Sequence, residues 1–172
     1  MKISLSFCRK IVILLLVTLM VSLTGFGFVN VDAANASRIK TLCNKDISLL
    51  SWKGDYLHRP DSAQGVTTWS TGIGNKWTVE CIKGKKHTIK LKSWKGDYLH
   101  RPDSAQGVTT WSTGIGNEWV VKPIADSNGK IELGSWKGDS LHRPDSAQGV
   151  TTWSTGIGNQ WIVVLWIESK KS

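Results

Sequence analysis

The sequence contains little Met, Tyr, Phe or Pro. Its 172 residues include only two Met, two Tyr, three Phe and four Pro, and it has no Pro- or Ser-rich stretch and no long charged tail. Since 40% of the residues are hydrophobic and 20% are charged, extensive disorder is excluded and one domain with its own core is expected. Against this background there are ten Trp and 17 Gly, and such biased use of one aromatic residue indicates a copied motif.

Long apolar runs are also scarce, and the strongest one lies at the N-terminus. Three basic residues precede Ile11–Val21, a run shorter than the ~20 residues that a membrane span requires. A looser run over 11–29 reaches that length, so a retained anchor is the alternative. We expect residues 1–33 to form a secretory signal peptide that is cleaved between residues 33 and 36, which leaves a single domain over 37–172.

Cysteine is scarce as well, and two of the three cysteines follow the signal peptide. In an exported protein, Cys43 and Cys81 form either one disulfide or a pair of buried thiols. Removing the signal peptide lowers the net charge from +9 to about +7. Much of the excess lies between Lys83 and Lys92, which is either a solvated hairpin edge or a surface that attracts anionic glycans, teichoic-type polymers or membranes.

One segment of 25 residues occurs three times, with copies 42 residues apart. The copies are Ser51–Asn75, Ser93–Asn117 and Ser135–Asn159. They differ at a single position, where Tyr56 and Tyr98 correspond to Ser140. Each copy contains four Gly and one Pro, which excludes helical repeats, and the absence of distinct capping repeats argues against an open solenoid.

Each repeat is predicted to contain four strands. Ile89–Lys92 alternates apolar and polar residues, Tyr56–Arg59 and Val66–Trp69 flank a turn rich in Pro, Asp and Gly, and Trp77–Val79 opens the fourth strand. Twelve strands in three units predict an all-β fold, the β-trefoil, in which six strands close a barrel and three hairpins cap it. The expected repeats cover about 45–86, 87–128 and 129–168.

The pattern Ile-x-Leu-x-Ser-x-x-Gly-x-Tyr-Leu, which begins at Ile89, resembles the repeat of fascin and hisactophilin. A Gly-Val-Thr element at 107–109 and a Trp-x-Val strand at Trp119 follow in the same order. The resemblance covers about residues 45–165, and it implies a β-trefoil and actin binding. A weaker resemblance, to ricin-type lectin trefoils, rests on Asn75-Lys76-Trp77 and its two copies, which stand where those lectins have Gln-x-Trp. It implies carbohydrate binding.

The segments between the copies have diverged. Between 77–92 and 119–134 only five positions coincide, all of them apolar, as a packed core alone would require. The copied segments instead keep exposed polar turns, which rarely matter to stability. Either the segment is a binding surface used three times, or gene conversion has made the copies uniform.

A saccharide site needs a flat aromatic face and fixed polar groups. Trp52, in a tight turn, is a candidate platform, and Trp69, at a strand end, belongs either to the site or to the core. Charged and imidazole side chains of the copied turns supply donors and acceptors. The predicted ligand-binding residues are Trp52, Asp55, His58, Arg59, Asp61 and Trp69, with Trp94, Asp97, His100, Arg101, Asp103 and Trp111, and with Trp136, Asp139, His142, Arg143, Asp145 and Trp153.

The copied residues also have interpretations that involve no ligand. Lys53 with Asp55, and Arg59 with Asp61, can neutralise one another within a turn, which contributes little to stability. Another set of indoles begins an alternating barrel strand, so we expect these side chains in the core. They are Trp77, Trp119 and Trp161.

Catalysis and metal binding fit the sequence poorly. His58, Asp61 and Ser62 lie in one short turn, where they cannot form a nucleophile–base–orienter arrangement. No separated pair of acids is singled out, and no second ligand class accompanies the repeated histidines at metal spacing. We therefore expect neither an enzyme nor a bound metal or cofactor.

Together these observations predict a secreted, extracellular and trivalent carbohydrate-binding protein of the lectin-like kind. Its expected partners are glycans or a cell-surface polymer, with no nucleic acid and no membrane span once the signal peptide is removed. One alternative is a fascin-like structural protein that binds actin or another filament. The other is a protein-binding toxin accessory or inhibitor.

Overall fold

The computed structural model describes residues 39–125, 127 and 129–167, so the predicted signal peptide lies outside the described residues. A helical turn at 39–42 precedes the strands, and within this part of the chain no helix has the length and apolar character of a membrane span. The strands are β1 (Asp46–Ser51), β2 (Tyr56–His58), β3 (Thr67–Trp69), β4 (Trp77–Cys81), β5 (Thr88–Ser93), β6 (Tyr98–His100), β7 (Thr109–Trp111), β8 (Trp119–Pro123), β9 (Lys130–Gly134), β10 (Ser140–His142), β11 (Thr151–Trp153) and β12 (Trp161–Leu165). Short 3-10 turns are η1 (Ile73–Asn75), η2 (Ile115–Asn117) and η3 (Ile157–Asn159).

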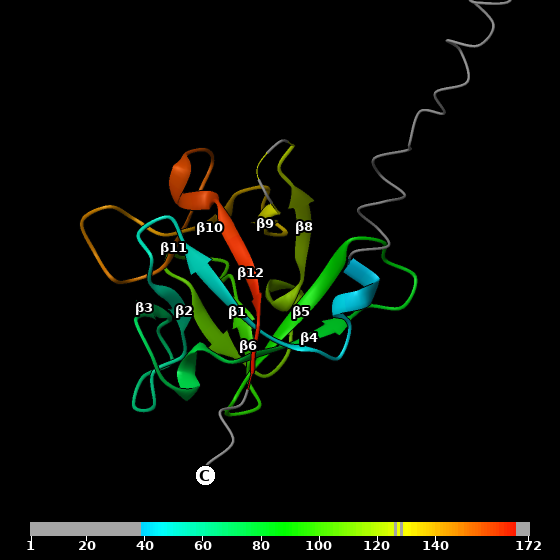
Figure 1. Ribbon diagram of the computed structural model, residues 1–172, viewed down its shortest axis with the longest axis horizontal. Coiled ribbons are helices and arrows are strands. Elements are labelled where there is room, and N and C mark those ends of the chain that lie inside the picture. The colour runs from blue at the N-terminus through cyan, green and yellow to red at the C-terminus, as the bar shows by residue number, and fades with distance from the viewer. Residues whose placement is uncertain (1–38, 126, 128, 168–172) are drawn as a thin grey trace, which may run out of the picture. The chain divides into compact units, whose positions relative to one another are not determined.

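Six strands close a barrel, as predicted. Each is antiparallel to its neighbours, in the cyclic order β1, β4, β5, β8, β9, β12 and back to β1. Figure 1 shows β12, in red, beside β1, in cyan, where the last repeat meets the first. The remaining strands pair as three hairpins, β2 with β3, β6 with β7 and β10 with β11.

The three hairpins are joined by a ring of backbone hydrogen bonds. Val66 donates to the carbonyl of Val108, Val108 to Val150, and Val150 back to Val66, each at 3.0 Å. The predicted strand Val66–Trp69 therefore begins one residue later, because Val66 pairs with another repeat. The predicted strand Tyr56–Arg59 ends at His58, because the Arg59 amide donates to Gly74 at 2.8 Å.

Tryptophans fill the barrel interior. Trp77, Trp119 and Trp161 are 0% exposed, which confirms the predicted core positions. Each indole N–H donates to a backbone carbonyl of the hairpin in its own repeat, for example from Trp77 to Leu57 at 3.0 Å. Burial of the large ring therefore leaves no polar group unsatisfied.

A disulfide fastens the start of the domain to the first repeat. Cys43, in the turn before β1, is bonded to Cys81, the last residue of β4, with a Cα–Cα distance of 5.4 Å. Backbone hydrogen bonds run beside it, from Asn44 to the Val79 carbonyl at 2.7 Å and from Val79 to the Lys45 carbonyl at 2.9 Å. The structure thus decides between the two states predicted for these cysteines in favour of the disulfide.

Candidate functional site

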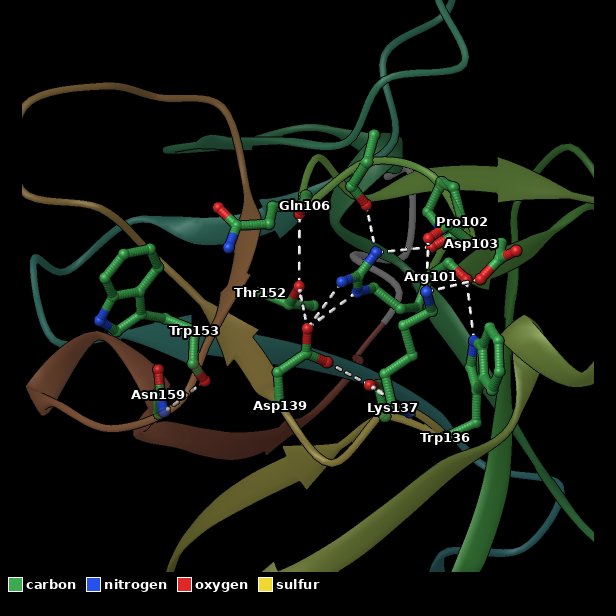
Figure 2. A network of polar contacts seen from close by, with 12 residues as sticks. Arg101, Pro102, Asp103, Gln106, Trp136, Lys137, Asp139, Thr152, Trp153 and Asn159 are labelled. Atoms are coloured by element: carbon green, nitrogen blue, oxygen red, sulfur yellow. Dashed lines mark hydrogen bonds and ion pairs between the residues drawn. The ribbon is translucent and has the colours of Figure 1, made fainter.

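Many of the copied polar residues connect one repeat to the next. The Arg101 guanidinium donates to Asp139 Oδ2 from Nε at 3.0 Å and from Nη2 at 2.8 Å, and only 6% of the arginine side chain is exposed. The same carboxylate accepts a hydrogen bond from Ser135 and another, at 2.7 Å, from Thr152 (Figure 2). Equivalent pairs join Arg59 to Asp97 and Arg143 to Asp55.

These contacts hold the three carboxylates in their charged form. Burial by itself raises the pKa of Asp139, but hydrogen bonds from Arg101, Ser135 and Thr152 lower it by more, so the net pKa lies below its ordinary value. The pKa values of Asp55 and Asp97 are lowered in the same way. The negative charge therefore persists under mildly acidic conditions.

A tryptophan and a lysine complete each junction between repeats. The Trp136 indole donates to the Arg101 carbonyl at 3.2 Å, and the Lys137 ammonium lies 5.0 Å from the centre of the indole ring. Lys137 Nζ also pairs with Asp103 at 2.5 Å (Figure 2). We call each such group a repeat clasp. The three clasps consist of Trp136, Lys137 and Asp139 with Arg101 and Asp103, of Trp94, Lys95 and Asp97 with Arg59 and Asp61, and of Trp52, Lys53 and Asp55 with Arg143 and Asp145.

The clasps correct two predictions. Arg59, Arg101 and Arg143 were predicted to face a ligand, but they are buried, because their guanidinium groups bind carboxylates and carbonyls inside the protein. Their partners Asp55, Asp97 and Asp139 are likewise used between repeats. The prediction that charges pair within one turn was also wrong. Every lysine and arginine of the clasps pairs with an aspartate of a different repeat.

The predicted platform at Trp52 is only partly available. The residue is 38% exposed, its indole N–H donates to the Arg143 carbonyl, and the Lys53 ammonium lies 5.0 Å from the ring centre. Trp94 and Trp136 are held in the same way. These indoles therefore serve the contact between repeats.

Trp69 is the more accessible of the two predicted platforms. It is 50% exposed and ends β3, and Ile73, four residues later, is 48% exposed. Trp111 with Ile115 and Trp153 with Ile157 repeat this arrangement. We call residues 69–73, 111–115 and 153–157 the lips. In the described part of the chain, no hydrogen bond occupies the side-chain hydroxyls of Ser70 and Thr71.

A histidine ring lies beside the tryptophan ring of each lip. The His58 ring lies 6.4 Å from the Trp69 ring, and its Nδ1 is 2.8 Å from Asn75 Oδ1. The Asn75 amide in turn donates to the Trp69 carbonyl at 3.4 Å. A Cβ at Gly74 would lie 2.3 Å from His58 Cε1, so only glycine lets the ring approach this closely.

A shallow hollow adjoins the lip of the first repeat. It is lined by Ser48, Tyr56, Ser70, Thr71, Gly72 and Asn75 together with the end of β12 and the residues after it, 164–167. Tyr56 lies directly opposite Trp69 in the hairpin, so the two side chains share one face of it. The structure thus brings His58 and Trp69 together at an open surface and separates them from Asp55 and Arg59.

Sequence reasoning missed Ile73 and Tyr56 as residues of this surface, and Asn75 as the buried residue that supports it. The available signal was the unchanged Gly-Ile-Gly-Asn element, in which an exposed apolar residue persists in all three copies. Tyr56 was detectable as the one variable position of the copied segment. Among the described residues, no group of three His, Cys, Asp or Glu side chains is placed to hold a metal ion.

Comparisons with known proteins agree on the architecture. No protein-family model matches the chain, and no curated protein matches it in sequence. Among solved structures, ThreeFoil, a designed 3-fold symmetric protein, superposes with a TM-score of 0.59 at 19% identity, over 69% of this chain and 97% of its own. The trefoil of BEL superposes with a TM-score of 0.61 at 14% identity, over 72% and 94% of the two chains. This chain is a β-trefoil.

Other β-trefoil neighbours include a protein solved with a saccharide. SeviL bound to asialo-GM1 saccharide superposes with a TM-score of 0.60 at 8% identity, over 70% of this chain and 97% of its own. A salivary protein from Culex quiquefasciatus, of the Cysteine and Tryptophan-Rich family, has a TM-score of 0.60 at 14% identity, over 73% and 96%. At these identities the likeness extends to the fold, and the resemblance to fascin and hisactophilin stays a prediction.

Proposed function

We propose that this β-trefoil is a secreted, non-catalytic carbohydrate-binding protein whose three lips are its binding sites. The observation that carries the proposal is that each copy keeps exposed apolar residues that take no part in the clasps. Contacts between repeats explain why Arg, Asp, Lys and the first Trp of each copy are retained. They do not explain why Trp69 and Ile73 are kept, exposed, in all three copies.

The chemistry of a lip suits a saccharide. An exposed indole offers a flat apolar face to the C–H surface of a sugar ring, and the neighbouring Ser70 and Thr71 hydroxyls are available for sugar hydroxyls. His58 and Asn75 hold the backbone beneath the ring, so little ordering is needed when a ligand binds. Exposed, repeated apolar groups on a rigid scaffold are typical of a binding surface.

Three sites on one chain raise the overall affinity for a glycan that can engage more than one of them. A single lip with a dissociation constant of ~1 mM contributes about 4 kcal/mol, as expected for one stacked sugar. Two or three lips that engage one branched or dense glycan raise the overall avidity by ~100-fold or more. This favours ligands on cell surfaces or polymers over free monosaccharides.

The test is a glycan array followed by titration calorimetry with a glycan that scores on the array. We expect the triple variant Trp69→Ala/Trp111→Ala/Trp153→Ala to lose binding while its melting temperature stays within ~3 °C of the parent, because the rings are half exposed. Val120→Ala removes an exposed apolar side chain from β8, outside the lips, and serves as the control. Unchanged binding in the triple variant would overturn the proposal.

A further inference from the structure

The three lips are alike, but the barrel strands beside them are not. Each hairpin pairs with one barrel strand, through Leu50 and Tyr56, through Lys92 and Tyr98, and through Gly134 and Ser140. We call three residues together the wall of each lip: the last two outward residues of this barrel strand, and the residue of the neighbouring barrel strand that lies opposite the first of them. The walls are Ser48, Leu50 and Val164 in the first repeat, Lys90, Lys92 and Glu80 in the second, and Glu132, Gly134 and Lys122 in the third. Because walls belong to the diverged segments, they give each lip a different chemical setting.

The wall of the second repeat is cationic. Lys90 and Lys92 lie two residues apart on β5 and point outward, since Ile89 and Leu91 between and beside them are buried. Their ammonium groups lie 5.7 and 6.0 Å from the centre of the Tyr98 ring. Two positive charges thus flank the aromatic residue that stands opposite Trp111.

Glu80 in this wall fixes the Tyr98 ring, and the wall still has a net positive charge. The Tyr98 hydroxyl donates to Glu80, with distances of 3.0 and 3.2 Å to the two carboxylate oxygens. Glu80 also lies 3.8 Å from Lys92 Nζ. Lys90 makes no direct ion pair among the described residues but stands directly opposite Glu80 in the β4–β5 register, so two lysines share one carboxylate and the group keeps one excess positive charge.

The corresponding positions in the other repeats lack this arrangement. The first repeat has Ser48 and Leu50 in place of the two lysines, and Ser48 is buried with its hydroxyl donating to the Asn75 carbonyl. The third repeat has Glu132 and Gly134 there, and Ser140 in place of the tyrosine. Its Lys122 stands opposite Glu132, with its side chain over Gly134. The first lip therefore has an uncharged wall beside an aromatic ring. The third has a wall in which one lysine faces one carboxylate, and it has no aromatic ring.

From these differences we infer that the lip of the second repeat selects an anionic saccharide, one that carries a carboxylate or a sulfate beside the stacked ring. The inference rests on the proposed function. Lys90 and Lys92 together supply one positive charge more than Glu80 balances, both are donors, and the fixed Tyr98 ring lies between them and Trp111. The first and third lips, which lack both lysines, bind neutral sugars.

The test compares two double variants of the full protein that remove the same charge. Lys90→Ser/Lys92→Leu installs the residues of the first repeat in the second wall. Lys40→Ser/Lys45→Leu makes the same replacements at exposed lysines outside the walls. The probes are a heparin oligosaccharide, which carries sulfate and carboxylate, an oligogalacturonate, which carries carboxylate alone, and a neutral dextran of matched length, each titrated at low and at physiological salt.

We expect the parent to bind at least one of the two anionic probes more tightly than dextran, with the preference weakened by salt. The wall variant should lose that affinity by ~10-fold or more, and the control variant by less than ~2-fold. Binding to the oligogalacturonate identifies the carboxylate as the recognised group, and binding to heparin alone identifies the sulfate. Melting temperatures of both variants should match the parent, because the four lysines are at the surface.

Two results would overturn the inference: no preference for either anionic probe, or an equal loss in both variants, which would mean that net charge rather than the wall attracts the anion. Neither result affects the proposed function, because neutral glycans on the array report on the lips independently. Loss of neutral binding in the triple lip variant together with no anionic preference would leave the proposed function standing and refute the inference alone.

Discussion

Arg143 of the third repeat donates to Asp55 of the first, with 2.7 Å between Nη2 and Oδ2 across 88 residues of sequence. This pair closes a ring in which every repeat contacts the next through the same side chains. A substitution on one side of a clasp leaves a charge or a donor unpaired on the other side. The clasp residues of the three copies therefore depend on one another, whereas the segments between the copies share only apolar core positions.

The clasps predict a large stability loss from a single arginine. Arg101→Ala should lower the free energy of unfolding by about 3–5 kcal/mol, because it leaves the Asp139 carboxylate partly buried and without its cation. Arg101→Lys, which keeps the charge but loses the two-pronged hydrogen bonding, should lose less. Urea unfolding followed by Trp fluorescence measures both, and a loss below about 1 kcal/mol for Arg101→Ala would contradict the clasp.

The lowered pKa values of Asp55, Asp97 and Asp139 predict acid sensitivity. A carboxyl group whose pKa is lower in the folded than in the unfolded protein stabilises the fold above the unfolded pKa, and this stability is lost as the pH falls toward the folded pKa. We expect the free energy of unfolding to stay level between about pH 5 and 7 with respect to these groups and to fall below about pH 4. Asp139→Asn should be less stable at pH 7 and show a shallower decline in acid.

Removing either of two tryptophans of one repeat should destabilise the protein by very different amounts. Trp77→Ala empties part of the barrel and should lower the free energy of unfolding by about 3–5 kcal/mol. Trp69→Ala should lower it by less than about 1 kcal/mol, because the ring is half exposed. Thermal melting of the two variants, measured side by side, distinguishes core from lip, and equal losses would place Trp69 in the core.

The disulfide should stabilise the domain without affecting the lips. Cys43 and Cys81 are 38 residues apart, and closing a loop of that length is worth about 4 kcal/mol through the entropy of the unfolded chain. Cys43→Ser/Cys81→Ser should therefore melt at a lower temperature and bind glycans as the parent does at 20 °C. Melting with and without a reducing agent checks the parent, and no shift on reduction would contradict the assignment.

The fold was predictable because its signals are local. Four short strands per repeat, three repeats and an alternating pattern at Ile89–Lys92 were enough for twelve strands and a barrel, and the strand that begins at Trp77 indicated a core indole. Strand ends were missed by one residue at Arg59 and Val66. Each of these residues leaves its hairpin for a backbone partner that local patterns do not reveal.

The candidate site was only partly predictable. When the copies are identical, the sequence does not show whether a residue pairs within its own copy or with another copy. Lys53 has an aspartate two residues away in its own turn, and the sequence alone does not show that it pairs with Asp145 instead. Exposure of Trp69 and burial of Arg59 likewise depend on which face of a short hairpin meets the next repeat. The repeat period identified the residues that matter, but only the tertiary structure separated those that join repeats from those left open to solvent.

The number of glycan molecules bound per chain tests the central claim most directly. Calorimetric titration with a short neutral glycan that scores on the array should give three sites, or two when the second lip rejects it. Trp69→Ala should remove one of these sites and leave the affinity of the others unchanged. A stoichiometry that Trp69→Ala does not alter, in a variant that folds as the parent does, would contradict the account.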